Sequence, residues 1–236
     1  MAGRVILCGD LPDRYEAERL LAERHPELHV ESVGRPWEMV ERAMSGAYDV
    51  ALILKGPIAT HEARLEGVAG LRRNAFAGKI LTAGAFLTEK QDAVRAGADY
   101  AFDPDKQPLE RVVGAALARP SVAVDHAYLR FLLVGEWAVV VPFGDAPPPT
   151  APDILLAATS CHPAPAFWGA LAAYVRANAA MRCVVVEDGG GDEAGTEALA
   201  TGIQPLVVLG QEGLGKLTDL VRRLLREAWL GRVAAA

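Results

Sequence analysis

The stretch that decides the fold is KILTAGAFLTEKQDAVRAGADYAFDPDKQPLERVVGAAL, residues 79–117. A short apolar run, residues 79–82, is followed by a segment of helical composition that stops at Gly97, a common helix-ending residue. A second apolar run, residues 100–102, precedes a segment with the apolar spacing of one helix face: Leu109, Val112, Val113, Ala116 and Leu117. Strand, helix, strand and helix with short connections predict parallel strands joined by helical crossovers.

The same alternation extends back to the start of the chain. Strands are expected at residues 5–8, 28–33 and 50–54, and helices at residues 15–25, 36–45 and 62–74. The third of these strands is a continuous apolar run behind Asp49, as expected for a strand that is covered on both faces. Five strands and five helices in alternation over residues 1–120 predict an α/β, flavodoxin-like doubly wound domain with strand order 2-1-3-4-5.

The order of these features resembles the receiver domain of bacterial response regulators. That family has a strand ending in Thr-Ala, a helix, Gly-Ala-Asp, a strand, Lys-Pro and a final helix. Thr82-Ala83 and Gly97-Ala98-Asp99 match this order, whereas Asp103 stands before Pro104 where the family has lysine. The resemblance covers residues 1–120, more loosely before Asp49.

The resemblance implies a phosphoryl-transfer site that this chain does not complete. A receiver uses a carboxylate after the third strand as acceptor, acids after the first strand to hold Mg²⁺, and a hydroxyl and a lysine on the phosphoryl oxygens. Here Gly9 replaces one acid, and the acceptor position falls on Leu54, or on Ile53 when counted back from Pro57. No Asp or Glu lies between Val50 and Thr60. The sequence therefore predicts a degenerate receiver site, or pseudo-receiver, made of Asp10, Leu54, Lys55, Thr82 and Asp103.

The second half of the chain repeats the pattern of the first. DILLAA at residues 153–158 parallels DVALIL at residues 49–54, and the final helical segment repeats the apolar spacing of residues 109–117. A period near 105 residues accounts for both matches and predicts a second, shortened receiver-like domain over residues 121–236. The alternative is that any two α/β halves look alike at this level.

The second copy is expected to lack one strand and two helices. Only APPPTAP, residues 146–152, separates Asp145 from Asp153. Residues 138–141 are expected to form the first strand of this copy. Residues 128–134 are then expected to fold back through Gly135-Glu136 as an antiparallel edge strand. The alternative is a connecting helix over residues 121–134.

Net charge, cysteine content and apolar run length make nucleic-acid binding, secretion and membrane insertion less expected for this chain. The net charge of −6 disfavours a generic nucleic-acid surface. Three cysteines favour a reducing cytoplasm, and no apolar run approaches the roughly 18 residues that span a bilayer. The histidines lack the spacing of a metal site, so no metal or cofactor is expected.

Two short motifs are weaker candidates. GQEGLGK, residues 210–216, approaches a phosphate-binding P-loop, but Leu217 stands where Ser or Thr should hold Mg²⁺. Ser160-Cys161-His162 puts a nucleophile beside an imidazole, but adjacent side chains seldom meet and no third, orienting residue is evident.

These features favour a non-enzymatic signalling or scaffold protein that acts through protein–protein surfaces, with a protein of unknown identity or a second copy as partner. In the receiver family the common partner face is formed by the fourth helix, fifth strand and fifth helix. By resemblance, the expected surface includes Thr88, Arg95, Tyr100, Phe102 and Arg111. The alternatives are a small-molecule or nucleotide sensor at the strand-end crevice near Asp10, Lys55 and Thr82, and an enzyme that uses Cys161 and His162.

Overall fold

The structure is a computed structural model that describes residues 3–56, 58–125, 129–130, 133, 136, 138–162, 164–188, 206–208 and 213–236. The chain divides into two compact units. The first comprises Met1–Ala118 together with Leu230–Ala236, and the second comprises Arg119–Trp229.

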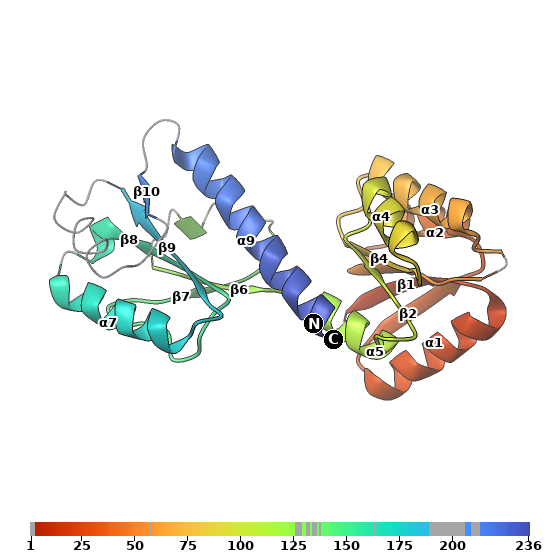
Figure 1. Cartoon of the computed structure of the whole chain (residues 1–236), viewed down its shortest axis with the longest axis horizontal. Helices are drawn as coiled ribbons and strands as arrows, with labels where there is room; N and C mark the ends of the chain where they lie inside the picture. Colours follow the sequence, from red (N-terminus) through yellow and green to blue (C-terminus); the bar gives the residue numbers. More distant parts are fainter. Residues whose placement is uncertain are drawn as a thin grey trace. The chain divides into compact units, whose positions relative to one another are not determined.

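The first unit is a five-stranded parallel sheet with helices on both faces (Figure 1). Its strands are β1 (Arg4–Cys8), β2 (His29–Val33), β3 (Val50–Ile53), β4 (Lys79–Ala83) and β5 (Tyr100–Phe102). Its helices are α1 (Leu11–Arg24), α2 (Pro36–Ser45), α3 (His61–Arg73), α4 (Leu87–Ala96) and α5 (Leu109–Leu117). The order β2-β1-β3-β4-β5 confirms the predicted flavodoxin-like topology.

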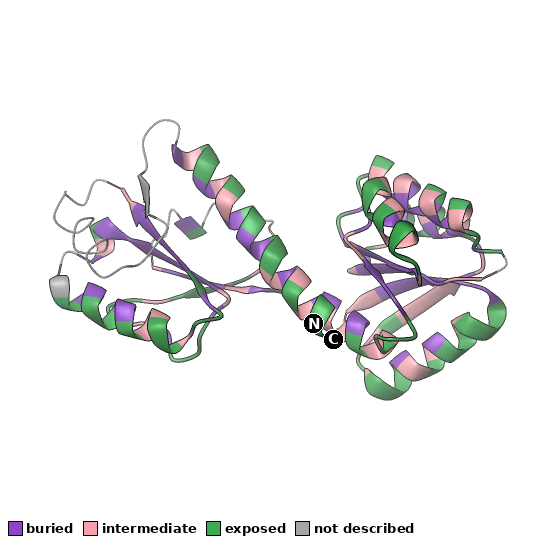
Figure 2. Ribbon diagram, in the orientation of Figure 1, coloured by how far each residue is buried: buried purple, intermediate pink, exposed green. Residues whose placement is uncertain are grey.

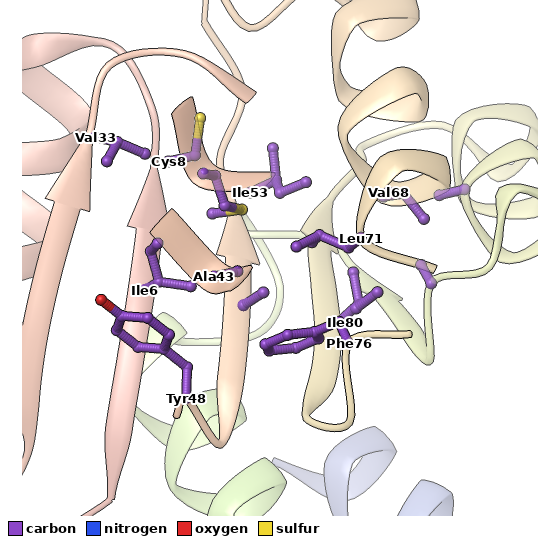
Figure 3. Packing of buried hydrophobic residues seen from close by; sticks show 14 of the residues in the cluster. Ile6, Cys8, Val33, Ala43, Tyr48, Ile53, Val68, Leu71, Phe76 and Ile80 are labelled. Atoms are coloured by element: carbon purple, nitrogen blue, oxygen red, sulfur yellow. The ribbon is translucent and has the colours of Figure 1, made fainter. Parts of the chain in front are cut away.

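Alternation along the strands divides the core between the two faces of the sheet. Ile6, Ile53 and Ile80 belong to a buried cluster with residues of α2, α3 and α4 (Figure 3). Leu7 and Leu52, which alternate with them, are fully buried as well. Figure 2 shows the resulting buried sheet between helices with exposed outer faces. Burial on both faces explains why β3 is apolar at every position.

The Gly97-Ala98-Asp99 motif joins α4 to β5. Gly97 ends α4 at φ 112°, a left-handed conformation that favours glycine. Arg72 on α3 donates to the Gly97 carbonyl over 2.7 Å and pairs with the Asp99 carboxylate over 2.5 Å. The same carboxylate accepts from the Ile80 amide at 2.8 Å. The motif therefore fixes α3, β4 and β5 to one another.

The second unit has the same strand order as the first. Its strands are β6 (Ser121–Val124), β7 (Val139–Pro142), β8 (Ile154–Ala158), β9 (Arg182–Glu187) and β10 (Leu206–Val208), and they pair in the order β7-β6-β8-β9-β10. Among the described residues its other elements are the 3₁₀ turn η1 (Thr159–Cys161) and the helices α7 (Pro165–Ala177) and α9 (Gly213–Ala235). A cluster with α9 covers one face of this sheet, and a cluster with α7 covers the other.

Asp49 and Asp153 precede equivalent strands, as the repeat predicts. The Asp49 carboxylate accepts from the Arg4 amide at 2.9 Å, and that of Asp153 accepts from the Ser121 amide at 2.6 Å. Each acid thus joins the start of the third strand of its sheet to the start of the first strand.

The predicted antiparallel edge strand is wrong. The first strand of the second unit is β6, and the edge position belongs to β7, which pairs parallel to β6. Within residues 128–134, Leu129 and Arg130 are helical, while residues 128, 131, 132 and 134 lie outside the described residues. Leu129 and Leu133 are buried in the α9 cluster, which is why this segment is too apolar for a linker. The alternative of a helix over residues 121–134 is also wrong for residues 121–124, which form β6.

The second unit therefore keeps the edge strand that the sequence suggested was missing. Residues 143–153, all of which are described, connect β7 to β8 without a helix where the first unit has α2. This proline-rich link is held at the Pro148 carbonyl, which accepts from the Tyr174 hydroxyl at 2.8 Å.

Candidate functional site

The five residues predicted to form a degenerate receiver site lie at the carboxyl edge of the first sheet. Asp10 follows β1, Leu54 and Lys55 follow β3, Thr82 lies in β4, and Asp103 follows β5. The carboxyl ends of parallel strands are where doubly wound folds place their ligands. In the part of the chain that the structure describes, however, no hydrogen bond joins any two of these five side chains.

Leu54 occupies the space that a second acid would need. A Cβ atom added at Gly9 would lie 3.1 Å from Cβ of Leu54 and 3.3 Å from its Cδ1. Leu54 itself is 6% exposed. The position that would accept a phosphoryl group is thus apolar and packed against the position that would help to hold Mg²⁺.

Asp10 is bound by the loop that follows β3. Both carboxylate oxygens accept from the Ile58 amide, at 3.2 Å and 3.1 Å. A Cβ atom at Gly56 would lie only 1.7 Å from Oδ2 of Asp10, so this loop approaches the carboxylate as closely as it does because residue 56 is glycine. Asp10 acts here as a loop anchor.

Lys55 belongs to a charge network centred on Glu89. Its Nζ lies 3.0 Å from the Glu89 carboxylate, which also pairs with the buried Arg64 at 3.5 Å. Burial alone would raise the pKa of Glu89, but Lys55 and the amides of Phe86 and Ala85 outweigh it and lower that pKa. Lys55 is therefore engaged by the start of α4.

Thr82 and Asp103 are both buried at the same edge. The Asp103 carboxylate pairs with Lys106 at 3.1 Å and accepts from the Asp105 amide at 3.2 Å. The Lys106 contact lowers the pKa of Asp103. Asp103, which stands in the place of the receiver lysine, thus binds a lysine from its own loop.

The predicted partner surface is exposed only in part. Thr88, Arg95 and Arg111 are exposed, and Tyr100 is half-buried, with its hydroxyl 3.1 Å from Oε1 of Gln107. Phe102 is fully buried, so its inclusion in a partner surface is wrong. Its place at the end of β5, with helices on both faces of the sheet, explains the burial.

Large apolar side chains are exposed at α4 instead. Phe86, which precedes the helix, is 69% exposed, Leu87 is 70% exposed and Val94 is 44% exposed. Leu87 and Val94 are seven residues apart, so they lie on one helix face. These three residues are called the α4 surface below.

The second unit contains a buried pair that the sequence did not reveal. Oδ2 of Asp125, directly after β6, lies 2.8 Å from Nε2 of His162 and accepts from the Ala158 amide at 2.8 Å. The two side chains are 1% and 4% exposed, respectively. Burial raises the pKa of Asp125. Asp125 orients the imidazole of His162, and the sequence signal that could have identified it is an acid directly after an apolar strand.

A network around Asp188 holds the turn that carries His162. The Asp188 carboxylate accepts from the amide of Ser160 at 2.9 Å, from its hydroxyl at 2.5 Å, and from the hydroxyl of Thr159 at 3.3 Å. Burial, and then the charges of Asp125 and Asp188, raise the pKa of Cys161 despite an opposing contact from Ser160. A raised pKa disfavours the thiolate, so the environment argues against Cys161 as a nucleophile.

Aromatic rings enclose the imidazole. The His162 ring stacks on Phe167 with centroids 3.5 Å apart, lies parallel to Phe143 at 6.1 Å, and meets Trp168 edge-on at 6.2 Å. The Trp168 indole donates to the His162 carbonyl at 3.0 Å. Ring and backbone of His162 are therefore both fixed.

The P-loop-like motif is described only in part. Residues 210–212 lie outside the described residues, and α9 begins at Gly213. The Thr218 hydroxyl, one position late for Mg²⁺, donates to the Leu214 carbonyl at 2.9 Å. Within the described ranges, no three metal-binding side chains gather, and no helix is long and apolar enough to cross a membrane.

Comparison with known proteins finds similarity in solved structures alone. No protein-family model matches the chain, and no curated protein matches its sequence. A structure described as a two-component system response regulator/GGDEF domain protein is 12% identical over 96% of this chain and 99% of that one, with a TM-score of 0.41. The GsuK channel is 13% identical over 94% of this chain and 70% of that one, with a TM-score of 0.34. Scores this low carry no inference about function, so the fold assignment rests on the strand order.

Proposed function

We propose that the first unit is a receiver-like domain that does not undergo phosphotransfer and acts through protein–protein contacts. The observation that carries this proposal is the packing of Leu54 against Gly9, which puts an apolar contact where a receiver has an acceptor carboxylate and a metal-binding acid. The remaining charged groups of the edge are bound locally: Asp10 by the Ile58 amide, Lys55 by Glu89 and Asp103 by Lys106.

These local partners argue against a sensor of small molecules at the carboxyl edge of the first sheet. Asp10, Lys55 and Asp103 would each have to give up an existing partner in order to bind a ligand. Replacing a formed hydrogen bond with another one yields little net free energy. Protein contact through an exposed surface requires no such exchange.

The α4 surface is the proposed contact. Its three members, Phe86, Leu87 and Val94, expose apolar area beside the exposed Thr88 and Arg95, which were expected to meet a partner. Burial of such area drives association, at about 25 cal/mol per Å². The partner is a protein, which includes a second copy of this chain.

Two measurements test the proposal. Acetyl phosphate with Mg²⁺ is expected to add no phosphoryl group, as read by intact mass, and beryllofluoride with Mg²⁺ is expected not to raise the unfolding temperature. A phosphorylated aspartate in the first unit would overturn the loss of phosphotransfer.

The second measurement addresses the surface. Leu87→Asp and Val94→Asp are expected to abolish capture of the partner from the native cell, or dimer formation in sedimentation. Leu11→Asp is the matched control, because Leu11 is 69% exposed at the start of α1. Equal loss in the control, or no loss in either α4 variant, would contradict the proposed surface.

A further inference from the structure

One carboxylate oxygen in the second unit is buried without a partner. Oδ1 of Asp125 receives no hydrogen bond from the described residues, although Oδ2 of the same group receives two. Buried polar atoms are almost always paired, so an unpaired one calls for a donor that the protein chain does not supply.

The imidazole holds the other oxygen of the same carboxylate. Oδ2 of Asp125 accepts from the Ala158 amide and lies 2.8 Å from Nε2 of His162. Oδ2 therefore has its partners, and Oδ1 is the oxygen that is left for a further donor.

The acids at the carboxyl edges of the two sheets differ in their partners. In the first unit, Glu89 pairs with Lys55 and Arg64, and Asp103 pairs with Lys106. In the second unit, Asp125 and Asp188 are bound by amides, hydroxyls and an imidazole, and no described lysine or arginine pairs with either. This edge carries negative charge that its own described side chains do not neutralise, so it favours a cation.

The chemistry of the surroundings selects the kind of cation. A metal ion is disfavoured because no three liganding side chains gather in the described ranges. An ammonium group has three donors and no acceptor, which complements an unpaired carboxylate oxygen in an acidic setting. Phe143, Phe167 and Trp168 surround the His162 ring, so apolar surface lies against the imidazole of the pair, where the carbon part of an organic amine can pack.

We propose that the carboxyl edge of the second unit binds the ammonium group of a small organic amine, which donates a hydrogen bond to Oδ1 of Asp125. The turn that carries His162 is held by Asp188, and His162 in turn contacts Oδ2 of Asp125, so the carboxylate is in place before the amine arrives. Ser160 on this turn is exposed, and Asp125 is only partly buried as a whole residue, so the site lies just below the surface. The inference is independent of the proposed function of the first unit.

The test compares methylammonium chloride with tetramethylammonium chloride on the full chain at equal ionic strength. Both ions are cations, but only methylammonium can donate a hydrogen bond. Methylammonium is expected to raise the unfolding temperature saturably and to shift the NMR signal of the Ala158 amide, which binds the other oxygen of Asp125. Equal responses to the two salts, or an unmoved Ala158 signal, would overturn the proposal and leave an ordered water as the partner of Oδ1.

Asp125→Asn and a matched control locate the effect. The asparagine variant is expected to bind methylammonium at least about tenfold more weakly, which is about 1.4 kcal/mol. Asp145→Asn removes an exposed acid from the same unit and should bind as the wild type does. Undiminished binding by a folded Asp125→Asn protein would refute the assignment. If that variant does not fold, the titration of Ala158 in the wild type decides the question.

Discussion

The side chain of Leu54, directly after β3, packs against Gly9, directly after β1, and leaves little room for a side chain at residue 9. A Cβ atom at residue 9 would lie 3.1 Å from Cβ of Leu54, closer than side chains usually pack. The side chain at residue 54 therefore limits which residues fit at position 9. Restoring either residue alone would disturb the contact.

Leu54→Asp is expected to destabilise the protein without making it a phosphoacceptor. The new carboxylate would lie in a site that is 6% exposed, with Asp10 still bound to the loop and no second acid beside it. We expect the free energy of unfolding to fall by roughly 3–5 kcal/mol, the range for an uncompensated buried charge. Urea denaturation measures this loss.

Leu11→Asp serves as its control. The same substitution at a residue that is 69% exposed and lies outside the α4 surface should change the stability by no more than about 0.5 kcal/mol. A Leu54→Asp protein that is as stable as the control, or that becomes phosphorylated, would show that this edge is more open than the packing indicates.

Gly56→Ala is expected to displace the loop from Asp10. The added Cβ would lie 1.7 Å from Oδ2 and 2.9 Å from Cβ of that residue, so one of them must move. Overpacking of this kind costs about 1–3 kcal/mol. Removing the Asp10 side chain relieves the clash, so Gly56→Ala in an Asp10→Gly background should cost at least about 0.5 kcal/mol less. Strict additivity in the double-mutant cycle would mean that the cost arises elsewhere.

The first unit could be predicted from local patterns because each of its elements is marked in the sequence. The apolar run of β3, the helix spacing at Leu109 and Val112, and Gly97 at the end of α4 all act within a few residues. Only the structure shows that the predicted site residues have separate partners, because Lys55 pairs with Glu89 and Asp103 pairs with Lys106.

The second unit could not be predicted in the same way. A short apolar run fits a strand or a buried helix equally well, and periodicity alone cannot decide between them. Residues 121–124 form the first strand, which neither the predicted hairpin nor the alternative connecting helix contains, and the edge position predicted for residues 128–134 belongs to β7. Asp125 and His162 are 37 residues apart, and only correct placement of β6 brings them together.

The stability of the second unit is expected to fall as the pH rises through the pKa of folded Asp125. Burial raises this pKa above its unfolded value, although the Ala158 amide and His162 oppose the shift. The carboxyl group is thus neutral at low pH without penalty, whereas its ionisation at higher pH puts a charge into a buried site.

Asp125→Asn should remove this dependence. The variant lacks the titrating group, so its unfolding free energy should decline less with rising pH than that of the wild type, as measured by urea denaturation across a pH series. Asp145→Asn, at an exposed acid, should retain the wild-type slope. Parallel curves for the wild type and Asp125→Asn would mean that the carboxyl group does not titrate differently on unfolding.

The edge strand β7 should tolerate charge on one face. Val139 and Val141 are 49% and 40% exposed, and they alternate with Val140, which packs against the α9 cluster. They therefore lie on the α7 face, at the place where α2 covers the edge of the first sheet and where the second unit has only its proline-rich link.

An exposed apolar edge strand invites pairing with another chain, and lysine on such an edge discourages it. Val139→Lys with Val141→Lys should change the unfolding free energy by no more than about 0.5 kcal/mol each and reduce self-association in light scattering. Val140→Lys should destabilise the unit instead, because its side chain enters the core. Unfolding of the double variant would show that a partner or the chain itself covers this face.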